Sequence, residues 1–190
     1  MSTNSVAMSA KRADNLNNSP LVAKYIQPWT SRDGRQVMLR PIHPEDRLIE
    51  KELIEHLSVE SSRFRFFDRI REATPEMLNQ FCNIDYVHQI AIIAEYKSDT
   101  EKRNVGVGRL IIEPDTESGE FAVVVADDFQ NNGLGTKLMN TLIDICREKG
   151  LKNIYGIVLK DNWKMLILAK KLGFTIEASS YQEVKVVREL

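Results

Sequence analysis

The segment that decides the fold is Val123-Val-Val-Ala-Asp-Asp-Phe-Gln-Asn-Asn-Gly-Leu-Gly-Thr136, in which an apolar run leads through two glycines into a helix. Glycine lets the backbone approach a ligand closely, because it has no side chain. Free N–H groups in the first turn of a helix, together with the helix dipole, attract anions, and phosphate is their usual occupant. The segment therefore predicts a phosphate-binding loop between a buried strand and a helix.

Two familiar phosphate loops do not match this segment. A dinucleotide-binding fingerprint needs a third glycine three positions after the second, and Leu138 occupies that position. A P-loop needs Gly-Lys followed by Ser or Thr, whereas Gly135 is followed directly by Thr136. The remaining pattern is Gln-x-x-Gly-x-Gly over residues 130–135.

The flanking sequence predicts alternating strands and helices. Leu134, Leu138, Leu142 and Ile145 recur at helical spacing, and Gly150 predicts the C-terminal cap of this helix. The other expected elements are strands at 37–39, 89–96, 105–112, 120–126, 154–158, 174–178 and 184–188, and helices at 44–57, 75–82 and 162–172. The resulting class is α/β (α+β), with helices on both faces of a mixed, mostly antiparallel central sheet.

Length and composition favour a single intracellular domain. A chain of 190 residues with 43% hydrophobic residues suits a single core, which we assign to residues 25–190, after a flexible polar leader at 1–24. A net charge of -1 argues against a nucleic-acid partner. The sequence has no membrane span or signal peptide, and two cysteines do not suggest a disulfide framework. We therefore expect a cytoplasmic protein with no membrane partner.

A second motif makes the pattern specific. Asn162-Trp-Lys-Met-Leu-Ile-Leu-Ala-Lys-Lys-Leu-Gly-Phe174 is an Asn-led helix that ends in Leu-Gly-Phe before a strand. The two motifs, in this order and spacing, resemble those of the GNAT acetyltransferases. Arg40-Pro-Ile-His-Pro-Glu-Asp46, Ser61-Ser-Arg-Phe-Arg-Phe-Phe67 and Glu120-Phe-Ala-Val-Val-Val125 look like the acetyltransferase domain of bacterial protein lysine acetyltransferases.

The resemblance implies a splayed central strand pair that binds acetyl-CoA. Backbone groups of Val123, Val124 and Val125 would pair with the pantetheine arm. The amides of the loop would hold the diphosphate: Gln130, Asn131, Asn132, Gly133, Leu134, Gly135 and Thr136. Asn162 and Met165 would line the arm. Lys137, Lys160 and Lys164 are further candidates for contacts with the CoA phosphates.

Direct transfer to an amine needs a base, because a lysine amine is mostly protonated at neutral pH. Glu120 is the first candidate, because related lysine acetyltransferases use an acidic residue at the matching position, and Asp85 is the second. We expect no metal. Ala169 stands where many relatives carry a tyrosine that protonates the departing thiolate, so Tyr155, a water or unassisted departure would have to serve.

Three functions remain open at this point. The first is acetylation of a protein lysine, the second is acetylation of a small amine or amino acid, and the third is non-catalytic sensing of acyl-CoA. Arg63 and Arg65, among Phe64, Phe66 and Phe67, either shape the acceptor site or form a salt-bridged part of the core. The sequence also leaves open whether the chain forms a homodimer.

Overall fold

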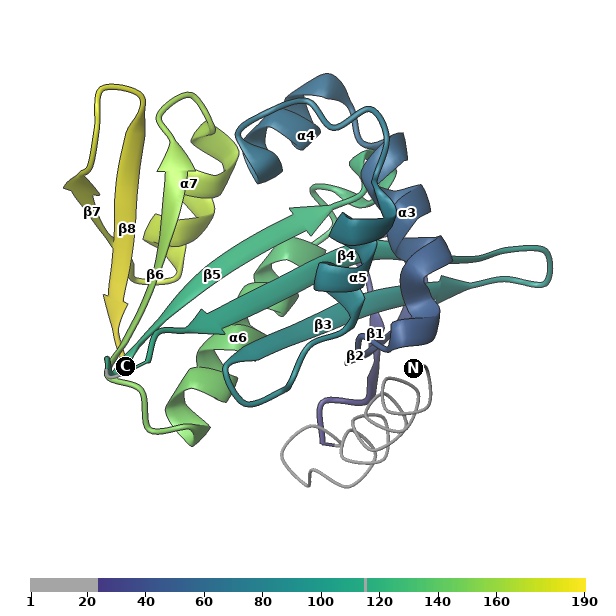
Figure 1. Ribbon diagram of the computed structural model, residues 1–190, viewed down its shortest axis with the longest axis horizontal. Helices are drawn as coiled ribbons and strands as arrows, with labels where there is room; N and C mark the ends of the chain where they lie inside the picture. The colour runs from purple at the N-terminus through teal and green to yellow at the C-terminus, as the bar shows by residue number, and fades with distance from the viewer. Residues whose placement is uncertain (1–23, 115) are drawn as a thin grey trace, which may run out of the picture.

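The computed structural model describes residues 24–114 and 116–190 of the chain. Residues 1–23 of the expected leader lie outside the described part. Eight strands form one sheet in the order β1-β2-β3-β4-β5-β6-β8-β7 (Figure 1). Neighbouring strands are antiparallel except β5 and β6, which are parallel. Among residues 24–114 and 116–190, no helix has the length and apolar character that a membrane crossing requires.

The elements follow the predicted order with two additions. The strands are β1 (Gln27–Thr30), β2 (Gln36–Pro41), β3 (Gln89–Lys97), β4 (Lys102–Ile112), β5 (Ser118–Val125), β6 (Asn153–Leu159), β7 (Thr175–Ala178) and β8 (Glu183–Glu189). The helices are α3 (Arg47–His56), α4 (Val59–Phe66), α5 (Pro75–Cys82), α6 (Leu134–Glu148) and α7 (Trp163–Lys171), with 3-10 turns η1 (Pro44–Asp46) and η2 (Asp127–Phe129). The mixed, mostly antiparallel sheet predicted from the sequence is confirmed.

The sequence did not predict β1 and α4, and each has a physical reason. β1 is a four-residue edge strand that contains Pro28, which removes one ladder donor. α4 has no apolar stripe, since its buried residues are Ser61 and Ser62. Its start is fixed instead by Ser58, whose side chain accepts a hydrogen bond of 3.1 Å from the Ser61 amide. Hydrophobic periodicity therefore could not reveal it.

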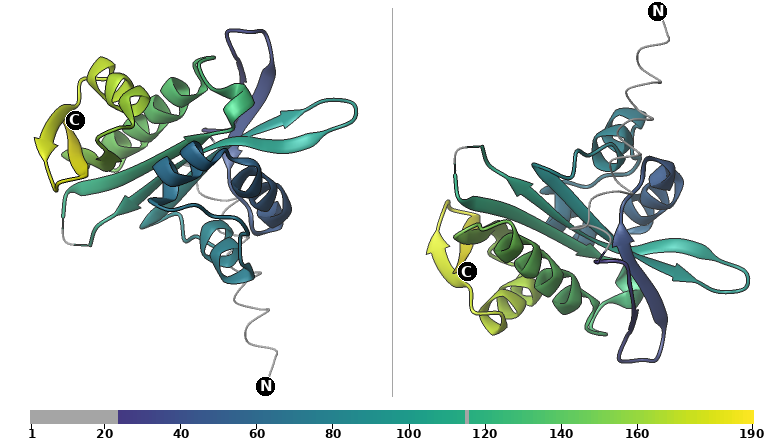
Figure 2. Two further views of the ribbon diagram at one scale, coloured as in Figure 1. Left: turned by 90° about the horizontal axis from the view of Figure 1, so that it is seen from above. Right: turned by 90° about the horizontal axis from the view of Figure 1, so that it is seen from below.

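Two helical layers cover the sheet. α3, α4 and α5 lie on one face, and α6 and α7 lie on the other (Figure 2). Residues 90–94 of β3 are all buried between the two layers. On β4, Gly106 and Gly108 let α6 come close, because a Cβ atom at Gly106 would lie 3.2 Å from Leu134 Cδ2 and one at Gly108 would lie 3.3 Å from Leu142 Cδ1. This close contact fixes the first turn of α6 beside β4 and β5.

Candidate functional site

The central opening in the sheet lies between β5 and β6. These two strands pair only over three residues, from Ser118 opposite Asn153 to Glu120 opposite Tyr155, and then diverge (Figure 1). α4 lies on one side of the opening and α7 on the other. Glu120, in the last of these pairs, therefore stands where the two strands separate. The predicted splayed strand pair is present.

The backbone of β5 presents alternate groups to this opening. The Ala126 N–H donates to the Val105 carbonyl at 2.9 Å, which fixes the hydrogen-bond phase between β5 and β4. Because antiparallel bonding alternates along a strand, the Val124 N–H faces β4, whereas those of Val123 and Val125 face the opening. The Val125 carbonyl accepts a 3.2 Å bond from Gln130 Nε2. The Val123 and Val125 amides thus face the opening, whereas Val124, which the sequence prediction also included, turns its N–H toward β4.

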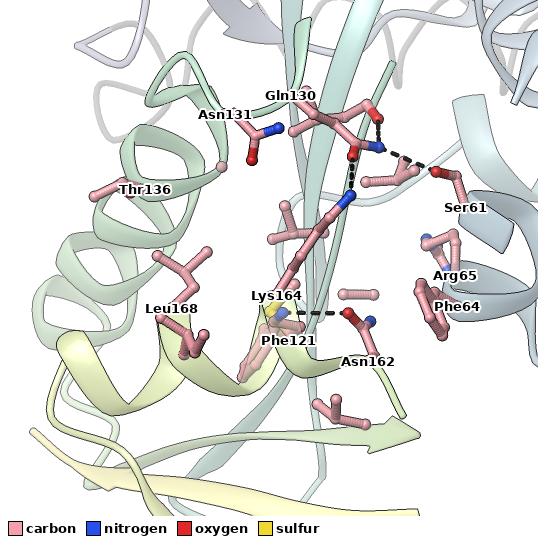
Figure 3. A pocket seen from close by; sticks show the side chains of 18 of the residues that line it. Ser61, Phe64, Arg65, Phe121, Gln130, Asn131, Thr136, Asn162, Lys164 and Leu168 are labelled. Atoms are coloured by element: carbon pink, nitrogen blue, oxygen red, sulfur yellow. Dashed lines mark hydrogen bonds between the residues drawn. The ribbon is translucent and has the colours of Figure 1, made fainter. Parts of the chain in front are cut away.

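A cavity of about 580 Å³ fills the opening. Figure 3 shows its wall, with Ser61, Phe64 and Arg65 on the α4 side and Asn162, Lys164 and Leu168 on the α7 side. Ten of the predicted CoA-site residues line it: Val123, Val124, Val125, Gln130, Asn131, Gly133, Gly135, Thr136, Asn162 and Met165. Asn132 and Leu134 do not line the cavity, and the Leu134 side chain is buried against β4.

The loop from Gln130 to Thr136 is built to bind an anion. Among the residues that the structure describes, the N–H groups of residues 131–136 have no hydrogen-bond acceptor. Gly133 has a φ of 94°, a left-handed conformation that suits glycine, and it directly precedes the 15-residue helix α6. Six free amides at a helix N-terminus match what a diphosphate requires.

Gln130 departs from the predicted role. The backbone N–H of Gln130 donates to the Asp127 carbonyl at 3.3 Å, so this N–H is not free to bind a phosphate. Its side chain instead donates to Val125 and to Ser61 Oγ, the latter at 3.0 Å. Gln130 therefore ties the loop to β5 and to α4.

Glu120 has the environment of a general base. It lines the cavity, and no hydrogen-bond partner is found for its carboxylate in the described part of the chain. Burial, followed by the nearby Glu113 carboxylate, raises the pKa of Glu120, while the charges of Arg65 and Lys185 act against this rise. A raised pKa makes a carboxylate a stronger proton acceptor, because its ionised form is more basic.

Asp85, the second candidate base, lies in the turn before β3. It does not line the cavity, and its carboxylate accepts the amide N–H groups of Val87, His88 and Gln89 at 2.9 to 3.0 Å. Burial opposes its ionisation, but these bonds prevail and lower the pKa of Asp85 to about 2. Asp85 therefore shapes the turn before β3.

The predicted sources of a general acid lie elsewhere. Ala169 is fully buried in α7 and carries no proton to donate. The Tyr155 hydroxyl bonds to the Glu113 carboxylate, and Tyr155 does not line the cavity.

Of the lysines considered for contacts with the CoA phosphates, Lys164 lines the cavity, whereas Lys137 bonds Gln27 and Lys160 bonds the Tyr181 carbonyl.

Sequence reasoning missed a hydrogen-bonded junction between the loop and α4. Asp127 accepts hydrogen bonds from the Ser58 amide at 2.9 Å, from Ser58 Oγ at 2.8 Å and from Ser61 Oγ at 2.7 Å. Arg32, in the turn between β1 and β2, also lines the cavity, and its amide donates to the Asn132 carbonyl at 3.1 Å. The partners in these contacts are far apart in sequence, so no local pattern signals them.

The comparisons with known proteins agree with this geometry. The model of the acetyltransferase (GNAT) family matches residues 53–174. The chain belongs to this family. An acetyltransferase of Pseudomonas aeruginosa is 37% identical over 158 residues, which cover 83% of this chain and 85% of that protein.

Two solved structures share the fold. The GNAT domain of S. lividans PAT has a TM-score of 0.80 at 22% identity, covering 88% of this chain and 98% of that one. The spermidine N-acetyltransferase of Vibrio cholerae, solved with CoA and spermine, has a TM-score of 0.66 at 22% identity, covering 80% and 95%. The chain is thus an acyltransferase of the GNAT family, which transfers an acetyl group from acetyl-CoA to an amine.

Proposed function

We propose that this acetyltransferase modifies lysine side chains of proteins, with Glu120 as the general base. One observation carries the assignment of acyl transfer with Glu120 as the base. Free amides at residues 131–136 stand at one end of the cavity, and Glu120, with its raised pKa, stands at the other end of the β5 wall. β5 thus offers an edge along which a CoA arm could extend from the loop to the base.

The proposal assigns a role in acetyl transfer to the loop amides, the β5 amides and Glu120. The amides of residues 131–136 hold the diphosphate, and the Val123 and Val125 amides bond the pantetheine arm. Glu120 takes a proton from the incoming ammonium group, directly or through one water, so that a neutral amine attacks the thioester carbonyl. The Val125 N–H, which faces the opening, is our candidate donor to the oxyanion of the tetrahedral intermediate.

The departing group needs little help. Collapse of the intermediate breaks the C–S bond and releases CoA as a thiolate, and an ordinary thiol pKa of about 8.5 makes this a tolerable leaving group. Neither Ala169 nor Tyr155 supplies a proton at the cavity. The attacking nitrogen loses its second proton as the amide forms, water carries that proton to the thiolate, and Glu120 returns its own proton to solvent.

The lysine acceptor rests on the resemblance of three segments to bacterial protein lysine acetyltransferases: residues 40–46, 61–67 and 120–125. A small amine is the second candidate, because the spermidine N-acetyltransferase of Vibrio cholerae shares the fold. The choice between these two acceptors depends on the α4 side of the cavity.

Acetyl-lysine proteomics tests the proposed acceptor. Cells lacking the protein would be complemented with the wild type or with Glu120→Gln, which keeps the side-chain volume but cannot accept the proton. We expect a set of acetylated lysines with the wild type alone. Identical acetyl-lysine profiles in the two strains, together with rapid turnover of polyamines by the purified enzyme, would favour the small-amine alternative instead.

A further inference from the structure

Arg65 on α4 is a half-buried arginine whose guanidinium lies 4.8 Å from the centre of the Phe66 ring and has no hydrogen-bond or ion-pair partner among the described residues. Arg40 pairs with Asp46 and Glu95, and Arg109 pairs with Glu50. By contrast, within residues 24–114 and 116–190 Arg65 forms no hydrogen bond or ion pair, and its Nε is shielded from solvent with no acceptor. A buried charged donor without an acceptor is costly, so it suggests a ligand that is not part of the chain.

The side chain lies at the acceptor end of the cavity. Ser61, bonded to Gln130 of the loop, stands one helical turn before Arg65. Arg65 lines the cavity beside Phe64, as Figure 3 shows. The charges that act on it are those of Arg109, Glu50 and Glu120. Arg65 therefore belongs to the end of the cavity where the base lies.

The nearby carboxylates are not its partners. Glu50 accepts bonds from Arg109 at 2.7 Å and from Asn104 at 2.8 Å. Glu120 forms no ion pair with Arg65 among the described residues, and such a pair would hold Glu120 as a carboxylate and reduce its basicity. The guanidinium is left available, and its planar fork can bind a carboxylate through two parallel hydrogen bonds.

Of the three ligand groups that the cavity would hold, only the acceptor can bring an anion to Arg65. The CoA diphosphate would lie too far away, because its site begins beyond Val125 and β5 from Glu120 to Val125 spans about 17 Å. The acetyl group is uncharged. We propose that Arg65 binds a carboxylate carried by the acceptor, which is either the α-carboxylate of an amino acid or an acidic side chain next to a lysine in a protein. The assignment rests on the acyl transfer at Glu120 proposed above, and it disfavours polyamines, because their charges repel a guanidinium.

Paired acceptors test this assignment. Lysine and cadaverine differ by one carboxylate, and two lysine peptides differ by Glu or Gln beside the lysine. We expect kcat/KM to favour the carboxylate-bearing member of one pair by about 10- to 100-fold, as for loss of a charged hydrogen bond. The pair that shows the preference identifies the source of the carboxylate.

Arg63 provides a matched control on the same helix. It is exposed, pairs with Asp161 at 2.8 Å and does not line the cavity. We expect Arg65→Gln to abolish the preference and Arg63→Gln to keep it. Arg65→Lys, which keeps the charge but lacks the planar fork, should retain a small part of the preference for the carboxylate-bearing acceptor. Acetyl-CoA affinity within about twofold of the wild type would show that each variant is folded.

Several outcomes would overturn the assignment. Equal kcat/KM within both pairs, or a preference that survives in Arg65→Gln, would exclude a carboxylate at Arg65. An Arg65-dependent preference for succinyl-CoA over acetyl-CoA would place the anion on the acyl group instead. If the wild type acetylates none of these amines, calorimetry of the CoA complex with lysine and cadaverine decides. Tighter, Arg65-dependent binding of lysine would then support the assignment while refuting the proposed reaction, and equal binding would refute both.

Discussion

The two ends of the cavity are built in different ways. At the loop end, the binding groups are main-chain amides of one continuous segment, residues 131–136. At the acceptor end, which we call the α4 end below, the binding groups are side chains from separate elements, with Arg65 on α4 and Glu120 on β5. The loop end therefore depends on backbone conformation and tolerates many side chains. The α4 end depends on individual side chains and can change its ligand by single substitutions.

Glu120→Gln should have the largest effect, because it removes the chemistry at the α4 end and leaves the loop end unchanged. General-base catalysis contributes about 10²- to 10⁴-fold, so we expect kcat/KM for the amine to fall by this factor. Acetyl-CoA affinity, measured by calorimetry, should not change. Glu117→Gln is the control, since Glu117 is exposed in the turn between β4 and β5 and pairs with Lys152, just before β6. A Glu120→Gln variant with wild-type kcat would exclude Glu120 as the base.

The pH profile sharpens the same point. Glu120 acts as a base only when ionised, so kcat should fall about tenfold per pH unit below its pKa in the enzyme–substrate complex. Since burial and Glu113 raise this pKa, the fall should begin at a higher pH than for an ordinary glutamate. The wild type and Glu120→Gln would be compared by stopped-time assays from pH 5 to 9. An acidic limb that is the same in both proteins would assign it to another group.

Gly133→Val should damage the loop end. Its φ of 94° is unfavourable for a β-branched residue, so the loop would rearrange and its amides would no longer converge. Strain of about 1–3 kcal/mol predicts about 10- to 100-fold weaker acetyl-CoA binding by calorimetry.

Gly150→Val is the matched control for this change. Gly150 has a φ of 71°, a Cβ there meets nothing within 4 Å, and it follows the far end of α6. This variant should lose similar stability but bind acetyl-CoA normally. Equal affinity of the two variants would show that the Gly133 conformation is not required for binding.

Asp127→Ala should uncouple the two ends, with a smaller effect. Burial opposes ionisation of Asp127, but the bonds from Ser58 and Ser61 outweigh it and lower the pKa of Asp127. Without them α4 is held less firmly, so we expect the KM for the amine to rise about 5- to 10-fold, with acetyl-CoA affinity nearly constant. Asp144→Ala, which removes an exposed contact of 3.4 Å to Arg147, should change neither constant. A matching loss of acetyl-CoA affinity in Asp127→Ala would show that the two ends are not separable.

Lys164→Gln should have the smallest effect. Its ammonium group lies 3.5 Å from Gln130 Oε1 and lines the cavity, but it is exposed. An exposed charge near a phosphate predicts about 2- to 5-fold weaker acetyl-CoA binding at low salt and no difference at high salt. Lys170→Gln, on the same helix but outside the cavity lining, should bind normally at both salt concentrations. A difference that persists at high salt would indicate a direct, shielded contact.

The contrast also explains what the sequence could predict. The loop and α7 are local segments in which glycines, a cap residue and helical spacing lie close together, so the sequence pointed to residues 130–136 and Asn162, and five of these seven loop residues line the cavity with Asn162. β1 and α4 were missed because neither carries an apolar pattern. The position of Asp85 outside the cavity follows from its bonding to three amides of the turn, which its residue type does not reveal. The Asp127 junction and the unpartnered Arg65 depend on long-range packing and could be found only in the structure.

A residue-resolved amide titration tests the central claim most directly. In ¹⁵N–¹H spectra of the protein with added CoA, the amides of residues 131–136, Val123 and Val125 should shift, and their hydrogen exchange should slow. The Val124 amide, which faces β4, should keep its exchange rate and provides an internal reference. Saturable CoA binding that leaves the amides of residues 131–136 unchanged would contradict the account.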